Sequence, residues 1–282
     1  MSEKHLVRLR QNGFRAILPG IESWYDMGNK SKTRRTGMDK VKQVAEHVNL
    51  ILRYIPYIQT NFVLGLDGDT GPEPFELTKR FLDLAPGAFP AYSLLSAFGR
   101  AAPLNLEYQR AGRVIPFPFT FLNNNHAMNV RPKNYTWPEF YDQVVGLSRY
   151  SFSWRAIRRR LTATEGMIPK WMNVVRAMSS EGWGRIEYHG TIRRLLDEDM
   201  TVRRFMDGET ERLPAFYARR IEHDLGPLYE HLPPGAMMHD PNAYLKSTTE
   251  IVPMAAPAPG RRAVRPLEHA RESAVTPTLG SY

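Results

Sequence analysis

The sequence predicts an α/β protein with a small parallel sheet, followed by a mainly helical region. Over the first hundred residues, short apolar stretches rich in β-branched residues alternate with segments of helical periodicity. Strands that alternate with helices indicate a parallel sheet with helices packed on it. No strand is predicted after residue 96, and helical patterns dominate from residue 136 onward. The chain has 282 residues, 42% of them hydrophobic, which is enough for one sizeable domain or two small ones.

The first hundred residues contain three expected strands, each preceded by a helix. The clearest helix lies between Met38 and Tyr54, where apolar residues recur every three or four positions and Pro56 follows. Three parallel strands are few, and the pattern opens on a helix, so we expect a fragment of a larger barrel or sheet. The predicted elements are, in order, helix Glu3–Asn12, strand Phe14–Leu18, helix Met38–Tyr54, strand Ile58–Leu64, helix Glu73–Leu84 and strand Ala91–Ser96.

The rest of the chain is expected to be irregular first and then helical. Residues 103–135 contain several prolines and a run of asparagines, and we predict no regular element there. Thr136, Pro138 and Glu139 form a helix-start signal. The predicted helices that follow are Trp137–Ala163 with breaks, Pro169–Ala177 and Ala215–Leu225. We therefore expect three regions: 1–135 with the sheet, 136–254 mainly helical, and 255–282 as a disordered tail rich in Pro, Ala, Arg and Ser.

Composition excludes several classes of site. The chain contains no cysteine, which rules out disulfides, thiolate metal sites and cysteine-ligated iron–sulfur clusters within it. No run of about 18 apolar residues is present, so we expect no membrane span and a cytoplasmic protein. The net charge is +9, but the basic residues are dispersed, with small clusters at 30–35, 158–160 and 261–265. We favour a solvated surface over a nucleic-acid-binding face, which stays an alternative.

Several short motifs occur in a consistent order over residues 5–161. Pro19-Gly-Ile-Glu-Ser23 is followed by a basic loop, and Gly65-Leu-Asp-Gly-Asp-Thr70 follows the second strand. A segment from Phe98 to Leu104 follows the third strand, and Tyr150-Ser-Phe-Ser153 precedes Ile157-Arg-Arg-Arg160. In this order the chain resembles the radical-SAM superfamily, in particular the group that often carries a cobalamin-binding domain. Asp67 stands where that group usually has proline.

The resemblance implies a partial TIM-like (β/α) barrel of which this chain supplies the last three strands. The other half of such a barrel carries a Cys-x3-Cys-x2-Cys loop that holds a [4Fe-4S] cluster. These residues contain no such ligands, so the chain is expected to be inactive alone and to retain only part of an S-adenosylmethionine (SAM) site. Three alternatives stay open: a fragment of a radical-SAM enzyme, a binding module that completes a split barrel with a separate polypeptide carrying the N-terminal half, and a basic nucleic-acid-binding protein. Substrate and reaction are not predicted.

The resemblance also assigns candidate SAM contacts at the carboxyl ends of the strands, where the active-site face of a barrel lies. Each has a structural alternative: a turn cap for the acidic residues, a solvated cation for the loop lysine, and a backbone partner for a buried amide. Gly65 is expected to allow close approach of adenine. The candidates are Glu22, Ser23, Lys30 (with Lys32 or Arg34 as substitutes), Asn61, Gly65, Asp67 and Ser96, with Ser93 and Asp69 as weaker ones.

Other polar clusters are weaker still. Asn123, Asn124, Asn125 and His126 form a polar run in a long loop, which could cover a substrate or lie on the surface. The pairs His223–Asp224 and His239–Asp240 lack the spacing of metal ligands, and we predict no metal site there.

Overall fold

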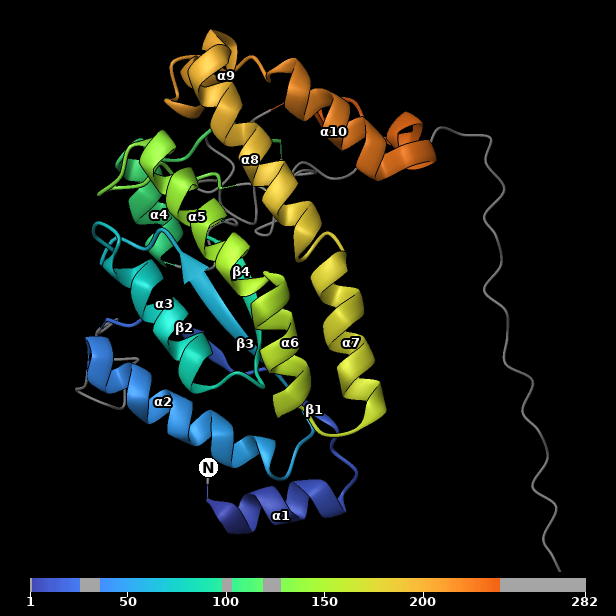
Figure 1. Cartoon of the computed structure of the whole chain (residues 1–282). Coiled ribbons are helices and arrows are strands. Elements are labelled where there is room, and N and C mark those ends of the chain that lie inside the picture. Colours follow the sequence, from blue (N-terminus) through green and yellow to red (C-terminus); the bar gives the residue numbers. More distant parts are fainter. Residues whose placement is uncertain (1, 26–35, 98–102, 119–127, 239–282) are drawn as a thin grey trace, which may run out of the picture. The chain divides into compact units, whose positions relative to one another are not determined.

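The computed structural model describes residues 2–25, 36–97, 103–118 and 128–238 (Figure 1). Its sheet is parallel, as the alternating pattern predicted. β3 (Tyr57–Leu64) is the central strand and pairs from Gln59 to Leu64 with β4 (Phe89–Leu94). β1 (Ala16–Ile17) and β2 (Gly20–Glu22) pair with successive parts of β3. The prediction of an α/β fold with a small parallel sheet is confirmed; among the described residues the sheet has four strands, where about three were expected.

The first expected strand, Phe14–Leu18, is shorter than predicted, and a second short strand follows it. Between β1 and β2 the backbone stays close to β3, because Asn61 N donates to the carbonyl oxygen of Pro19 at 3.0 Å. Pro19 itself has no N–H for the ladder, and the register shifts between Gly20 and Glu22. Glu22 adopts a left-handed backbone, with φ of 63°, which ends the strand. The sequence pattern predicted a strand that contains β1, but it did not predict β2.

Helices α1 (Glu3–Gln11), α2 (Gly37–Leu52) and α3 (Glu73–Leu84) agree with the predicted segments to within two residues. The expectation of an irregular chain after residue 103 was wrong at its start, since α4 spans Pro103–Arg110. Proline is tolerated in the first turn of a helix, because the N–H it lacks would have no partner there. Val114 and Val130 then form an isolated antiparallel bridge.

The predicted helix Trp137–Ala163 is two helices, α5 (Trp137–Ser151) and α6 (Trp154–Ala163). α5 begins with the expected capping box of Thr136 and Glu139, and Ser153 caps α6 by accepting from Ala156 N at 3.2 Å. The remaining helices are α7 (Met167–Met178), α8 (Trp183–Glu198), α9 (Met200–Met206), α10 (Ala215–Leu225) and the 3₁₀ helix η3 (Gly226–His231).

α8 and α9 were not predicted. The buried face of α8 contains Arg185 and His189 beside apolar residues, so its hydrophobic periodicity is weak. Asp199 caps α9, accepting from Thr201 N at 2.8 Å. α5 and the strands contribute to one continuous core, so the change at residue 136 is a change of secondary structure within one packed unit. The predicted tail, 255–282, lies outside the described residues.

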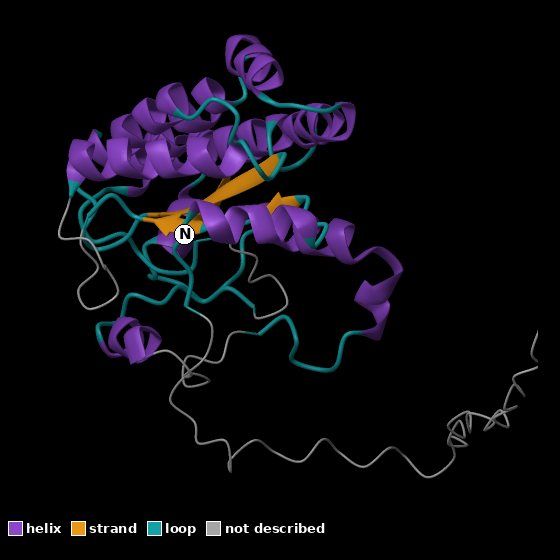
Figure 2. Ribbon diagram, turned by 90° about the horizontal axis from the view of Figure 1, so that it is seen from below, coloured by secondary structure: helices purple, strands orange, loops and turns teal. Residues whose placement is uncertain are grey.

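Successive side chains of a strand point to opposite sides of the sheet, and helices cover only one of these two sides. Most helices lie on one side of the strands (Figure 2). There Phe62 contacts Trp24, Phe81 and Tyr92, and this covered face is the centre of the core. The opposite side of the sheet, which we call the open face, carries Tyr57, Gln59, Asn61 and Val63 of β3 with Phe89, Ala91 and Ser93 of β4. Tyr57 and Phe89 are buried at one end of it, and the other five residues are half-buried. Among the described helices, none is long and apolar enough to cross a membrane.

Candidate functional site on the open face of the sheet

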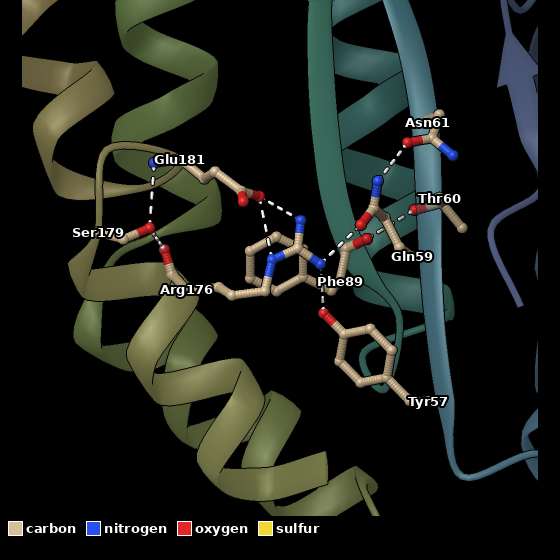
Figure 3. A network of polar contacts seen from close by, with 8 residues as sticks. All are labelled: Tyr57, Gln59, Thr60, Asn61, Phe89, Arg176, Ser179 and Glu181. Atoms are coloured by element: carbon tan, nitrogen blue, oxygen red, sulfur yellow. Dashed lines mark hydrogen bonds and ion pairs between the residues drawn. The ribbon is translucent and has the colours of Figure 1, made fainter. Parts of the chain in front are cut away.

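A row of polar side chains runs along β3 on the open face (Figure 3). Tyr57, Gln59 and Asn61 occupy alternate positions, so they share one side of the strand. The side-chain amide Nε2 of Gln59 donates to Asn61 Oδ1 at 2.6 Å. Asn61 Nδ2 donates to the carbonyl oxygen of Pro19 at 3.3 Å, which ties the row to the β1–β2 connection. We call Tyr57, Gln59 and Asn61 the polar row.

Arg176 reaches the polar row from α7. Its guanidinium Nη1 donates to Tyr57 Oη and to Gln59 Oε1, both at 2.6 Å. Its guanidinium carbon lies 4.3 Å from the centre of the Phe89 ring, which is close enough for a cation–π contact (Figure 3). The arginine therefore closes one end of the open face and fixes the orientation of Gln59, and through Gln59 that of Asn61.

Glu181 holds Arg176 from the other side. Its carboxylate Oε2 accepts from Arg176 Nε at 3.0 Å and also from Nη2. Burial acts against the charge of Arg176, but the hydrogen bonds of Glu181 and Tyr57 outweigh it and raise the arginine pKa. The Tyr57 pKa is raised by burial, which Arg176 only partly offsets. The guanidinium is therefore firmly charged and the phenol firmly protonated.

The short loop between α7 and α8 positions Glu181. Ser179 Oγ donates to Arg176 O at 2.8 Å and accepts from Glu181 N at 3.2 Å. At Gly182 a Cβ atom would lie 2.0 Å from the carbonyl oxygen of Ala177, so no larger residue fits this approach. The glycine lets the chain turn tightly enough to return Glu181 to Arg176.

The remaining part of the open face is accessible. Asn61, Val63, Ala91 and Ser93 are half-buried, and the last two are small. An asparagine amide has two N–H donors and an oxygen with two lone pairs. The two bonds of Asn61 described above leave one donor and one acceptor site for a ligand. The surface can thus present an oriented amide beside the half-buried apolar side chains of Val63 and Ala91.

Glu22 and Ser23 lie at the end of β2 but differ in exposure. Glu22 is exposed, and its side chain folds back over Gly20. Ser23 is buried, and its Oγ accepts from Tyr25 N at 3.1 Å, while Lys40 Nζ donates to the Ser23 carbonyl oxygen at 2.7 Å. Ser23 thus caps a local turn, and only Glu22 is available to a ligand.

The turn after β3 is fully engaged within the protein. Gly65 has φ of 89°, and a Cβ there would lie 2.8 Å from Met128 Cε, so a side chain already occupies the approach expected for adenine. Asp67 accepts two hydrogen bonds from Arg113, each of 2.8 Å. Asp69 Oδ2 accepts from Leu66 N at 3.1 Å, and burial raises the pKa of its carboxyl to about 6. These contacts are those of a structural turn.

The other candidates are dispersed. Ser93 lies on the open face, and Ser96 Oγ donates to Leu94 O at 3.2 Å just beyond β4. His223 and Asp224 form a 3.3 Å pair at the surface. In the described ranges no three His, Asp or Glu residues gather as metal ligands. Candidates outside the described residues are Lys30, Lys32, Arg34, Asn123, Asn124, Asn125, His126, His239 and Asp240.

The structure therefore brings Asn61 and Ser93 together on one face and adds residues that the sequence did not single out. Gln59 could have been found, because it precedes Asn61 by two positions in a strand and must share its face. Arg176 and Glu181 gave no such signal, since they are more than a hundred positions away from β3. Comparisons with known protein families, with curated proteins and with solved structures give no match to this chain.

Proposed function

We propose that this chain forms one part of a radical-SAM-type parallel barrel, and that the open face of its sheet binds the nucleoside part of SAM. The observation that carries the proposal is the oriented amide of Asn61 beside Val63, Ala91 and Ser93 on an accessible face of parallel strands. Ribose hydroxyls and adenine edges both donate and accept hydrogen bonds, as the free positions of Asn61 do. The small residues of β4 leave room for a flat ring.

The second part of the proposal concerns the edge of the sheet. Within the described residues, the edge of β3 away from β4 pairs only with the short strands β1 and β2. Phe14 and Leu18, which flank β1, are about half exposed. A strand edge with exposed apolar neighbours favours pairing with another strand. We propose that a polypeptide segment outside these 282 residues adds further parallel strands there.

That segment would also have to supply the iron–sulfur cluster. Cluster irons are held by cysteine thiolates, and this chain has no cysteine, so its own residues do not fit the group. The chain's proposed contribution is binding and orientation: Arg176 fixes Gln59, Gln59 fixes Asn61, and Asn61 positions the ligand. Glu22, at the end of β2, is the remaining exposed candidate for a polar contact to SAM.

The test is a SAM titration of the isolated chain followed by the methyl NMR signals of Val63 and Ala91. Because the chain offers only part of a site, we expect saturable shifts with a Kd of about 1 mM. Adenosine should shift the same signals, whereas methionine should not. The Asn61→Ala variant should bind about fivefold more weakly, as expected for the loss of one hydrogen bond.

The matched control is Asn49→Ala. Asn49 also donates its amide to a carbonyl oxygen, that of Leu84 at 2.8 Å, but it lies on α2. This variant should bind SAM as the unmodified chain does. If Val63 and Ala91 show no shift at tenfold the expected Kd, or if Asn61→Ala shifts equally, the open face is not a nucleoside site.

A further inference from the structure

α7 exposes an apolar stripe to solvent. Its inward side carries Asn173 and Ala177, which are buried, whereas its large apolar side chains face solvent. Ile168 is 76% exposed and Trp171 is 62% exposed. These side chains recur every three or four residues and therefore form one contiguous exposed apolar patch, and contiguous patches, unlike scattered apolar residues, mark interaction sites. The apolar stripe consists of Met167, Ile168, Trp171, Met172, Val175 and Met178.

The first half of the stripe borders a hollow. Met167, Ile168 and Met172 form one wall, and the other walls come from α1, from β1 and from the turn between α2 and β3. The hollow has a volume of about 660 Å³ and is open to solvent. Ala16 of β1 and Leu52 of α2 line it. A concave apolar surface of this kind accepts side chains that project from a partner helix.

The edge of the hollow is positively charged. Arg10, Arg15 and Arg53 line it together with a single carboxylate, that of Glu165. All three arginines are exposed, and in the described part of the chain none of them forms a salt bridge. A partner that covers the hollow would therefore meet uncompensated positive charge, and acidic side chains on that partner would be favoured.

We propose that the stripe and the hollow bind an amphipathic helix with acidic residues beside its apolar face. A helix fits better than a lipid surface, because helix side chains can fill a hollow that a flat bilayer surface would leave empty. β1 borders both the hollow and the open sheet edge, so this helix belongs to the polypeptide that adds strands to that edge. This assignment of the partner rests on the proposed function, whereas the chemistry of the surface does not.

The test uses a labelled 18-residue synthetic helix with leucines on one face and glutamates beside them, and a second peptide with lysines in place of the glutamates. In fluorescence anisotropy with the full chain, the glutamate peptide should bind at least about tenfold more tightly than the lysine peptide. The variant Trp171→Ser should weaken binding about tenfold, as the loss of an interface anchor does. The control Leu228→Ser removes an apolar side chain of similar exposure, 66%, from η3 and should leave binding unchanged.

A charge reversal gives a result that misfolding cannot imitate. The double variant Arg15→Glu/Arg53→Glu should prefer the lysine peptide. Equal binding of both peptides by the unmodified chain would overturn the proposal. So would binding of anionic phosphatidylserine vesicles in preference to the glutamate peptide, or self-association of the chain that Trp171→Ser abolishes. Peptide binding without the SAM shifts at Val63 and Ala91 would sink the proposed function and leave the docking surface standing.

Discussion

Replacing Arg176 with methionine should lower the free energy of unfolding by far more than the loss of an exposed surface ion pair does. Methionine keeps much of the apolar length of the side chain but removes every donor. Tyr57 Oη and Gln59 Oε1 would each lose a charged hydrogen bond, and such bonds contribute about 1.5–3 kcal/mol. The contact with the Phe89 ring would also be lost, at about 0.5–1 kcal/mol. Glu181 is partly exposed and can regain water, so we assign it little of the cost.

Together these losses predict a decrease of about 3.5–7 kcal/mol in the free energy of unfolding, measured by urea denaturation. The matched control is Arg193→Met on α8. Arg193 bonds to Asp142 and Asp197, whose side chains are 59% and 57% exposed. Its removal should cost less than about 1 kcal/mol. If the two variants lose equal stability, the buried contacts of Arg176 with β3 do not anchor α7, and the reasoning about the polar row is wrong.

Two further predictions concern the turns beside the open face. Because burial raises the Asp69 pKa from 3.8 to about 6, the folded state binds its proton more tightly than the unfolded state does. Stability should therefore fall as the pH rises from about 4 to about 7, by at most about 3 kcal/mol relative to Asp69→Asn in urea unfolding at each pH; a constant difference between the two proteins would contradict this. Gly182→Ala should lower the melting temperature, since overpacking costs about 1–3 kcal/mol. Gly190→Ala, in the middle of α8 with no atom near its Cβ position, should raise it slightly, and equal effects of the two would refute the close approach to Ala177.

Local patterns were enough to predict most of the first hundred residues. The periodic apolar residues of α2 and α3 and the β-branched run of β3 gave these elements nearly at their observed bounds, because each pattern repeats over several turns or pleats. α8 escaped prediction because Arg185 and His189 lie on its buried side, where a sequence reading expects apolar residues. Elements with mixed buried faces depend on tertiary packing, and that packing is not visible in a local window.

In the candidate site, too, part of the arrangement follows from the local sequence and part depends on contacts between distant segments. Asn61 was a candidate because the resemblance places a polar residue at this position of the strand, and the structure places it on the open face with both ends of its amide oriented. Gly65 and Asp67 follow a strand, as binding residues often do. In the structure, however, the side chain of Met128 packs against Gly65, and Arg113 forms a salt bridge with Asp67. Contacts between distant segments decide whether a residue at a strand end faces a ligand or the protein itself, and one sequence does not encode them locally.

The most direct test of the central claim locates the ligand. With SAM bound to the isolated chain at millimolar concentration, intermolecular nuclear Overhauser effects should connect the ribose protons to the methyl groups of Val63 and Ala91, and should be lost in Asn61→Ala. Contacts from SAM to the methyl groups of Met167 or Met172 alone, or the same contacts in Asn61→Ala, would contradict a nucleoside site on the open face of the sheet.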